Sequence, residues 1–230
     1  MGSLPYIIAS LSLISAIFSG LFNIKDRPMA RTSFKTLASV LFLATAIFSM
    51  YQAEKDTNYT IMVLTALTSG MLGDIFLSVD GLVFEKYRNY FMVIGAICFG
   101  MGHILFSAIF LSLVGSFEYY LLIIMAIIPI LLFLMSKMAK INFGKFTIPV
   151  YVYSIMLSLM LITGINLFIQ NGTIGALLIL IAAILFTISD SCLALKEFAY
   201  KGRHKPLIYI VLITYYIAQN LFALTVMLSV

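Results

Sequence analysis

The sequence predicts an all-α protein, a polytopic transmembrane bundle of eight helices. Three observations predict this class: 63% of the 230 residues are hydrophobic, only 10% are charged, and the mean hydropathy is +1.11. An ordinary soluble domain is about one quarter charged, and a soluble fold of this size could not cover so much apolar surface. The composition therefore excludes a soluble enzyme, a disordered chain and a nucleic-acid-binding protein, despite a formal charge of +5.

Eight apolar windows are long enough to cross a membrane. A helix that rises ~1.5 Å per residue needs about 20 apolar residues to cross ~30 Å of hydrocarbon. The windows cover residues 4–22, 34–51, 61–79, 90–113, 118–136, 147–169, 174–195 and 207–229. They use nearly the whole chain, so we expect residues 1–230 to form a single integral membrane domain. We expect the first span to be retained, because no basic segment precedes it, and Pro129 predicts a kink in the fifth.

The basic residues predict the orientation of the bundle. Thirteen of the 14 lie in or beside the loops that follow the first, third, fifth and seventh spans: Lys25, Arg27, Arg31, Lys35, Lys86, Arg88, Lys137, Lys140, Lys145, Lys196, Lys201, Arg203 and Lys205. The opposite side has only Lys55. Because basic loops stay in the cytoplasm, we expect both termini to be non-cytoplasmic, in a multi-pass protein of the bacterial plasma membrane.

The two halves of the chain, 1–114 and 115–230, resemble each other. A shift of 116 residues superposes the spans in order, and places Asp74 on Asp190 and His103 on Gln219. Each half has four spans, an even number, so both halves run in the same direction. The pattern indicates two parallel four-helix repeats related by an axis along the membrane normal. A chance match between apolar sequences is an equally open alternative.

Asp74 and Asp190 are the only acidic residues deep within the predicted spans. Each lies five residues before the inner end of its window, so we expect both carboxyl groups at the same depth. A charge inside the bilayer costs several kcal/mol and usually faces the bundle interior, where it has a function. The alternative is that both groups only hold helices together through hydrogen bonds. We favour the functional interpretation.

Other polar residues lie in the same spans. His103 is the only histidine within a span, and Tyr215 and Gln219 share one face of the last span at the i, i+4 spacing. Lys35 opens the second span at the inner rim, where it either reaches the headgroups or binds a ligand phosphate. Tyr151 lies near the inner end of the sixth span, a position also typical of an interfacial aromatic residue.

The chain lacks the usual signatures of metal and phosphate chemistry. It has no Gly-x-Ser-x-Gly elbow, no His-Glu-x-x-His motif and no glycine-rich phosphate loop. A zinc site needs several His or Cys ligands in one shell, whereas Cys98 and Cys192 both lie in apolar runs without metal-ligand spacing. We therefore expect neither a metal nor a cofactor, which leaves proton donation and carboxylate stabilisation as the available chemistry.

Several segments together resemble a known family. They are Ser-Gly-Met-Leu-Gly-Asp-Ile-Phe-Leu at 69–77, Gly-His at 102–103, Phe-Thr-Ile-Ser-Asp-Ser-Cys-Leu-Ala at 186–194 and Tyr-Tyr-Ile-Ala-Gln at 215–219. With eight spans, this pattern is similar to the YhhN-like lysoplasmalogenase family of membrane proteins. The resemblance implies hydrolysis of the vinyl ether bond of lysoplasmalogens, which gives a fatty aldehyde and a glycerophospho-base. It implies Asp74 and Asp190 as catalytic residues, and the expected substrate-binding residues are Lys35, His103, Tyr151, Ser189, Tyr215 and Gln219.

Vinyl ether hydrolysis suits a pair of buried carboxyl groups. One group protonates the double bond and the other stabilises the resulting oxocarbenium ion, as paired carboxylates do in glycosidases. We expect a lysophospholipid substrate and surrounding membrane lipids as partners. The alternative function is a proton-coupled transporter of a small solute or lipid, because such carriers also use aspartates within the membrane. A third alternative is a structural protein that binds lipid without turnover.

Overall fold

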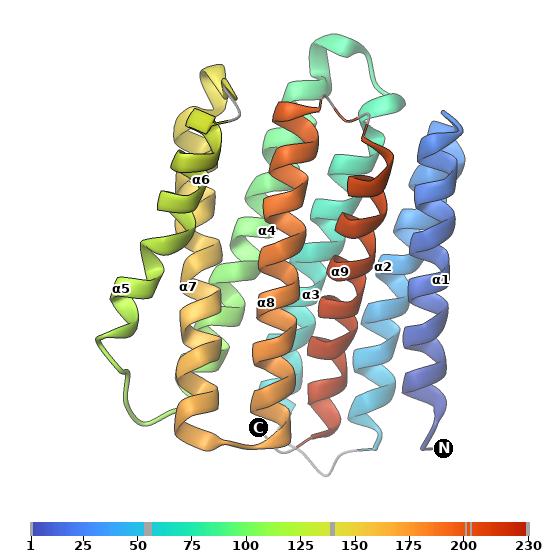
Figure 1. Ribbon diagram of the computed structural model, residues 1–230. Helices are drawn as coiled ribbons and strands as arrows, with labels where there is room; N and C mark the ends of the chain where they lie inside the picture. The colour runs from blue at the N-terminus through green and yellow to red at the C-terminus, as the bar shows by residue number, and fades with distance from the viewer. Residues whose placement is uncertain (1, 53–56, 139–140, 201, 203, 229–230) are drawn as a thin grey trace.

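The structure is a computed structural model that describes residues 2–52, 57–138, 141–200, 202 and 204–228. Within this part of the chain, eight segments are helical, long and apolar enough to cross a membrane, which confirms the predicted all-α class (Figure 1). The helices are α1 Leu4–Ile24, α2 Pro28–Met50, α3 Thr57–Ser78, α4 Glu85–Ser112, α5 Leu121–Met125, α6 Ile127–Met138, α7 Thr147–Asn171, α8 Ile174–Ala194 and α9 Lys205–Leu224. A π-helical turn, Leu195–Ala199, extends α8.

The fifth span is broken into α5 and α6. The break falls at Ala126, three residues before Pro129. Proline has no N–H to donate, and its ring crowds the carbonyl group four residues earlier, here that of Met125. The predicted kink at Pro129 is therefore confirmed, and it takes the form of an interruption between two short helices.

The second span begins earlier than predicted. Helix α2 starts at Pro28, six residues before the expected boundary at residue 34. Proline is well tolerated in the first turn of a helix because the N–H that it lacks would have no partner there. As a correction, Lys35 does not open the span: it lies two turns inside α2, where its side chain points into the bundle and is only 17% exposed.

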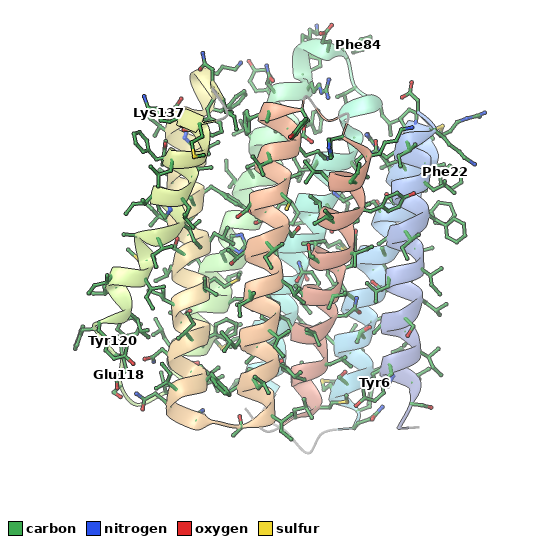
Figure 2. All side chains as sticks on the ribbon, in the orientation of Figure 1. Tyr6, Phe22, Phe84, Glu118, Tyr120 and Lys137 are labelled. Carbon is green, nitrogen blue, oxygen red and sulfur yellow. The ribbon has the colours of Figure 1, made fainter. Side chains whose placement is uncertain are left out.

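The two termini lie at one end of the bundle and the hairpin between α1 and α2 lies at the other (Figure 1). In Figure 2, Lys137 and Phe84 lie at the hairpin end, and Tyr6, Glu118 and Tyr120 at the end with the termini. Lys55, Lys140, Lys201 and Arg203 fall outside the described residues. Which end faces the cytoplasm stays a prediction from the basic residues.

Helices α3 and α8, which carry the two aspartates, occupy corresponding places in the bundle. Helix α3 packs against α2 and α4, and α8 packs against α7 and α9. The two halves also exchange contacts, since α4 packs on α7 and α9 packs on α2. These pairings correspond under the shift of 116 residues, although the internal duplication itself stays a prediction.

Glycines allow α3 and α4 to approach closely beside Asp74. A Cβ atom on Gly73 would lie 2.7 Å from the ring of Phe99, and one on Gly95 would lie 2.8 Å from Leu77 Cγ. Neither position has room for a larger side chain, because real Cβ atoms do not approach so closely. This contact fixes Asp74, the neighbour of Gly73, against the face of α4 that carries Phe99.

Candidate functional site

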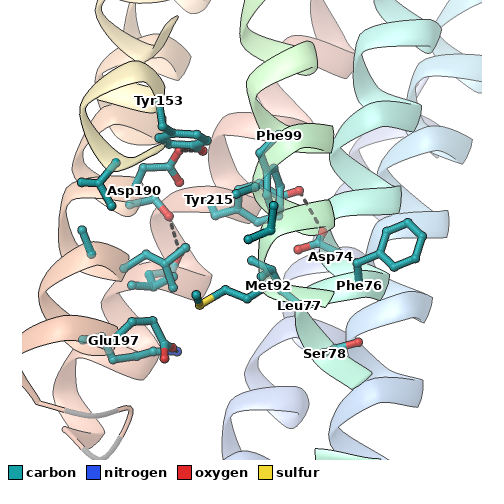
Figure 3. A pocket seen from close by; sticks show the side chains of 18 of the residues that line it. Asp74, Phe76, Leu77, Ser78, Met92, Phe99, Tyr153, Asp190, Glu197 and Tyr215 are labelled. Atoms are coloured by element: carbon teal, nitrogen blue, oxygen red, sulfur yellow. Dashed lines mark hydrogen bonds and ion pairs between the residues drawn. The ribbon is translucent and has the colours of Figure 1, made fainter. Parts of the chain in front are cut away.

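Both aspartates line one cavity of about 550 Å³ inside the bundle. Its lining begins at the hairpin end of the bundle, which we call the basic end because Arg31, Arg88 and Lys196 contribute to the rim there. From this end it continues inward to Asp74 and Asp190. In Figure 3 the rim is marked by Glu197 and Ser78, and the two aspartates lie further in, on opposite sides of the space. The cavity therefore joins a cationic mouth to two acidic groups within the membrane.

Asp74 is almost fully buried, with 1% of its side chain exposed. Its Oδ1 atom lies 3.1 Å from the ammonium nitrogen of Lys35. Its Oδ2 atom accepts hydrogen bonds from Ser39 Oγ at 2.7 Å and from Tyr215 Oη at 2.8 Å. Tyr216 Oη is a third donor at 3.2 Å. The carboxyl group is thus surrounded by donors and one cation, an environment that suits a carboxylate.

Gln219 supports this cluster from behind. Its Nε2 atom donates to Tyr215 Oη at 2.9 Å, so the proton of the Tyr215 hydroxyl group is directed toward Asp74. Gly70 makes room for the amide, because a Cβ atom at that position would lie 2.3 Å from Gln219 Nε2. Gln219 therefore acts on Asp74 through Tyr215 and is not part of the cavity lining.

Asp190 has a different set of partners. Tyr153 donates a short hydrogen bond to its Oδ2 atom. His103 is fully buried, and its Nε2 atom lies 3.2 Å from the same oxygen and 3.0 Å from Tyr153 Oη. The other ring nitrogen of His103 faces Met160 Sδ at 3.3 Å. The Asp190 carboxyl group, the His103 imidazole and the Tyr153 hydroxyl group thus lie within hydrogen-bond distance of one another.

Aromatic rings connect the two clusters. The ring of Phe186 lies 4.8 Å from that of His103 and 5.2 Å from that of Tyr215, edge-to-face in both cases. Phe99 makes a further edge-to-face contact with Tyr215 at 5.6 Å. Such pairs are favourable beyond their buried area. In Figure 3, Tyr215 and Phe99 lie between the two aspartates. Aromatic side chains therefore form the part of the cavity lining that connects the two acids.

A second aromatic group packs the bundle further from the rim. Phe106 and Phe110 on α4 pack against Phe222 of α9, with ring centroids 4.1 and 5.9 Å from that of Phe222. All three side chains are buried, and none of them lines the cavity. They fill the bundle between the site and the end that carries the termini, so the site is approached from the basic end or from the side.

The structure brings together most of the residues predicted for the site. The cavity is lined by Lys35, Asp74, Ser189, Asp190 and Tyr215, and His103 and Gln219 bond to these residues from behind. The Ser189 hydroxyl group donates to the Val211 carbonyl oxygen at 3.1 Å. Tyr151 does not line the cavity, because it projects from another side of α7 and packs against Phe143.

Sequence reasoning missed Ser39, Tyr153 and Tyr216 as members of the site. Ser39 follows Lys35 by one helical turn, so the i, i+4 rule could have placed it on the same face. Tyr153 lies two residues from Tyr151, and only the rotation of α7 in the bundle decides which of the two rings faces inward. Among the described residues, no group of three His, Cys, Asp or Glu side chains forms a metal-binding set.

In a comparison with known protein families, residues 30–226 match the YhhN family. The chain belongs to the YhhN family. The match spans both aspartates and every polar partner described above, so the resemblance found in the motifs is confirmed. YhhN members include lysoplasmalogenases. No curated protein and no solved structure matches the chain.

Proposed function

We propose that this YhhN protein hydrolyses the vinyl ether bond of lysoplasmalogens to a fatty aldehyde and a glycerophospho-base. The observation that carries the proposal is the pair of aspartates, Asp74 and Asp190, which line one cavity but have different partners. Acid-catalysed hydrolysis of a vinyl ether needs a proton donor, and a carboxylate nearby would stabilise the cation that forms. Family membership supports the same reaction.

Asp74 is proposed to act as the carboxylate. Every polar neighbour of its two oxygen atoms is a donor or the Lys35 ammonium group. A protonated Asp74 would leave the Lys35 ammonium group, 3.1 Å from Oδ1, without a counterion inside the bundle. The negative charge, balanced by Lys35, is then available to stabilise a cation that forms in the cavity.

Asp190 is proposed to act as the acid. We assign His103 the Nδ1–H tautomer, with this nitrogen facing Met160 Sδ at 3.3 Å. Its Nε2 atom is then an acceptor for a proton on Asp190 Oδ2. The group as a whole is then neutral, as a site within the membrane requires. His103 holds the Asp190 carboxyl group in place, because the two side chains are in direct contact.

The proposed reaction begins with transfer of the Asp190 proton to the vinyl carbon farther from the ether oxygen. The positive charge that develops on the other carbon and on the ether oxygen is stabilised by the Asp74 carboxylate. Water adds to this carbon and gives up a proton to the Asp190 carboxylate. The resulting hemiacetal loses its hydroxyl proton and breaks its bond to the glycerol oxygen, which takes up a proton, so that aldehyde and alcohol are released. General acid catalysis of this kind contributes about 10²–10⁴-fold.

The cavity suits a single-chain lipid with a phosphate in its headgroup. Arg31 and Arg88 bring positive charge to the rim, where it would attract a phosphate group. Arg31 also donates to Asn23 Oδ1 and to the Ser78 carbonyl oxygen, which fixes its position. Deeper walls such as Leu77, Met92 and Val93 are apolar. A phosphate held at the rim leaves the first bonds of the chain near the two aspartates, which is where the vinyl ether lies in a lysoplasmalogen.

The test is turnover by purified protein in detergent, without any ion gradient. We expect release of fatty aldehyde from a lysoplasmalogen, and no release from the saturated alkyl ether analogue. Thr187→Ala is a matched control, because the Thr187 hydroxyl group bonds only to its own helix at the Ala183 carbonyl oxygen, and it should retain activity. EDTA should leave the rate unchanged. Uptake of substrate into vesicles without aldehyde release would instead support the transporter.

A further inference from the structure

Part of the cavity lining lies on the outer surface of the bundle. Ile97, Met101 and Ile104 of α4 are 56%, 53% and 45% exposed, and Val152 of α7 is 45% exposed, yet all four line the same cavity as the aspartates. On helices that cross a membrane, an exposed apolar side chain faces lipid. The cavity therefore has a side opening toward the bilayer as well as the mouth at the basic rim.

These side chains form a continuous groove along the seam between α4 and α7. We define the α4–α7 groove by Val93, Ile97, Met101 and Ile104 on α4 and by Pro149 and Val152 on α7. The four α4 residues recur every three or four positions, so they make one stripe along the helix. The two helices are in direct contact behind the stripe, which gives the groove a floor.

A flexible side chain lines the cavity where α4 and α7 meet. Met156 of α7 also lines the cavity, and a Cβ atom on Gly100 of α4 would lie 2.9 Å from its Sδ atom. Gly100 therefore provides the space that Met156 occupies. On the inner side of the same two helices, Tyr153 and His103 hold Asp190. Methionine is unbranched and adapts to irregular shapes, so Met156 can move aside without disturbing these hydrogen bonds.

We infer that the α4–α7 groove holds the hydrocarbon chain of a single-chain phospholipid, which reaches the aspartates sideways from the leaflet at the basic end. The inference rests on the proposed function for the identity of the lipid. Charge complementarity favours this occupant, because a phosphate is negative and the rim is positive. The groove starts at this rim, where Arg31 and Arg88 line the cavity. The headgroup phosphate of a lysophospholipid fits the cationic rim, and its hydrocarbon chain fits the apolar groove along α4.

The length of the groove agrees with this occupant. From Asn89 at the rim to Ile104, α4 advances 15 residues, or about 22 Å at ~1.5 Å per residue. Half of the hydrocarbon core is about 15 Å thick. A chain that follows the groove from the rim therefore reaches across its own leaflet, and a lipid can enter without leaving the membrane.

Photo-crosslinking tests the groove without relying on turnover. The probe is a saturated 1-O-alkyl lysophosphatidylcholine with a sixteen-carbon chain and a diazirine at its far end, incubated with the full-length protein in detergent. We expect labelling that excess unlabelled alkyl lysophosphatidylcholine competes away, within 97–104 of α4 and 152–156 of α7. Labelling spread over all lipid-facing helices, or concentrated on α1 and α2, would overturn the inference.

A pair of variants provides a matched comparison. Ile97→Trp fills the groove, whereas Ile94→Trp adds the same bulk to a side chain that is 41% exposed on α4 but does not line the cavity. We expect Ile97→Trp, but not Ile94→Trp, to reduce crosslinking and to raise KM for long-chain substrate roughly tenfold, the size of effect that a few apolar contacts have in a pocket. Equal effects of both variants would contradict the groove. Site-specific crosslinking without aldehyde release would refute the proposed reaction and leave the groove intact.

Discussion

The Lys35 ammonium nitrogen lies 3.1 Å from Asp74 Oδ1, and the two side chains are 17% and 1% exposed. This ion pair is the reason why a carboxylate can persist within the membrane-spanning part of the bundle. A lone charge there would cost several kcal/mol, whereas a pair with additional hydrogen bonds from Ser39 and two tyrosines is tolerated. The arrangement suits an ionised Asp74 beside the cavity, which is the state proposed for it above.

Lys35→Met should destabilise the protein, because it leaves the buried Asp74 carboxylate without its cation. Breaking a buried pair costs about 3–5 kcal/mol, so we expect a clearly lower Tm in detergent and loss of turnover. In the double variant with Asp74→Asn, stability should recover while activity remains absent. Lys86→Met is the control, since Lys86 lies over the ring of Tyr87 outside the bundle core. A single variant as stable as the wild type would refute the role given to the pair.

Asp74→Asn and Asp190→Asn should each lower kcat by at least about 10²-fold while the protein remains folded and inserted. Asparagine preserves the shape of the side chain but neither donates a proton as an acid nor carries negative charge. Glu118→Gln serves as the control, because Glu118 lies at the opposite end and pairs with Gln170. The measurement is aldehyde release per molecule of purified protein, and near-normal rates would remove that aspartate from the site.

Gly70→Ala should damage the site through Gln219. The added methyl group would meet Gln219 Nε2 at 2.3 Å, and overpacking of this kind costs about 1–3 kcal/mol. We expect a lower Tm and reduced kcat, because Tyr215 loses the amide that orients it toward Asp74. Gly102→Ala is matched, since a Cβ atom there meets its nearest neighbour at an ordinary 3.5 Å. If both variants behave alike, Gly70 has no special role.

The orientation of the bundle can be tested by thiol labelling of intact cells. In a background without Cys98 and Cys192, Glu118→Cys should react with a maleimide that cannot cross the membrane, and Lys86→Cys should not. We expect this result because the basic residues are concentrated in the loops at one end of the bundle, and basic loops stay in the cytoplasm. Labelling of position 86 and protection of position 118 would place the termini in the cytoplasm instead.

The spans could be predicted from the sequence because hydrophobicity decides them locally. Their ends were harder to place, since Pro28 extends α2 by two turns beyond the apolar window. The common depth of Asp74 and Asp190 followed from helical rise alone, and the structure places both in one cavity.

The side chains that face each aspartate could not be predicted from the sequence, because they depend on contacts between helices that are far apart along the chain. Tyr216 reaches Asp74 only because α9 packs between α8 and α2. Tyr153, and not Tyr151, reaches Asp190 because of the rotation of α7 about its axis. Neither the helix order nor the rotation leaves a signal in a single sequence.

The most direct test of the central claim is turnover of a lysoplasmalogen by the purified protein in heavy water, with the aldehyde analysed by mass spectrometry at short times. If a solvent-exchanged acid such as Asp190 protonates the vinyl ether, the carbon next to the aldehyde group gains one deuterium atom. Asp190→Asn should abolish this product. Aldehyde formed by the wild-type protein without deuterium on that carbon would show that the double bond was never protonated, and would contradict the two-aspartate mechanism.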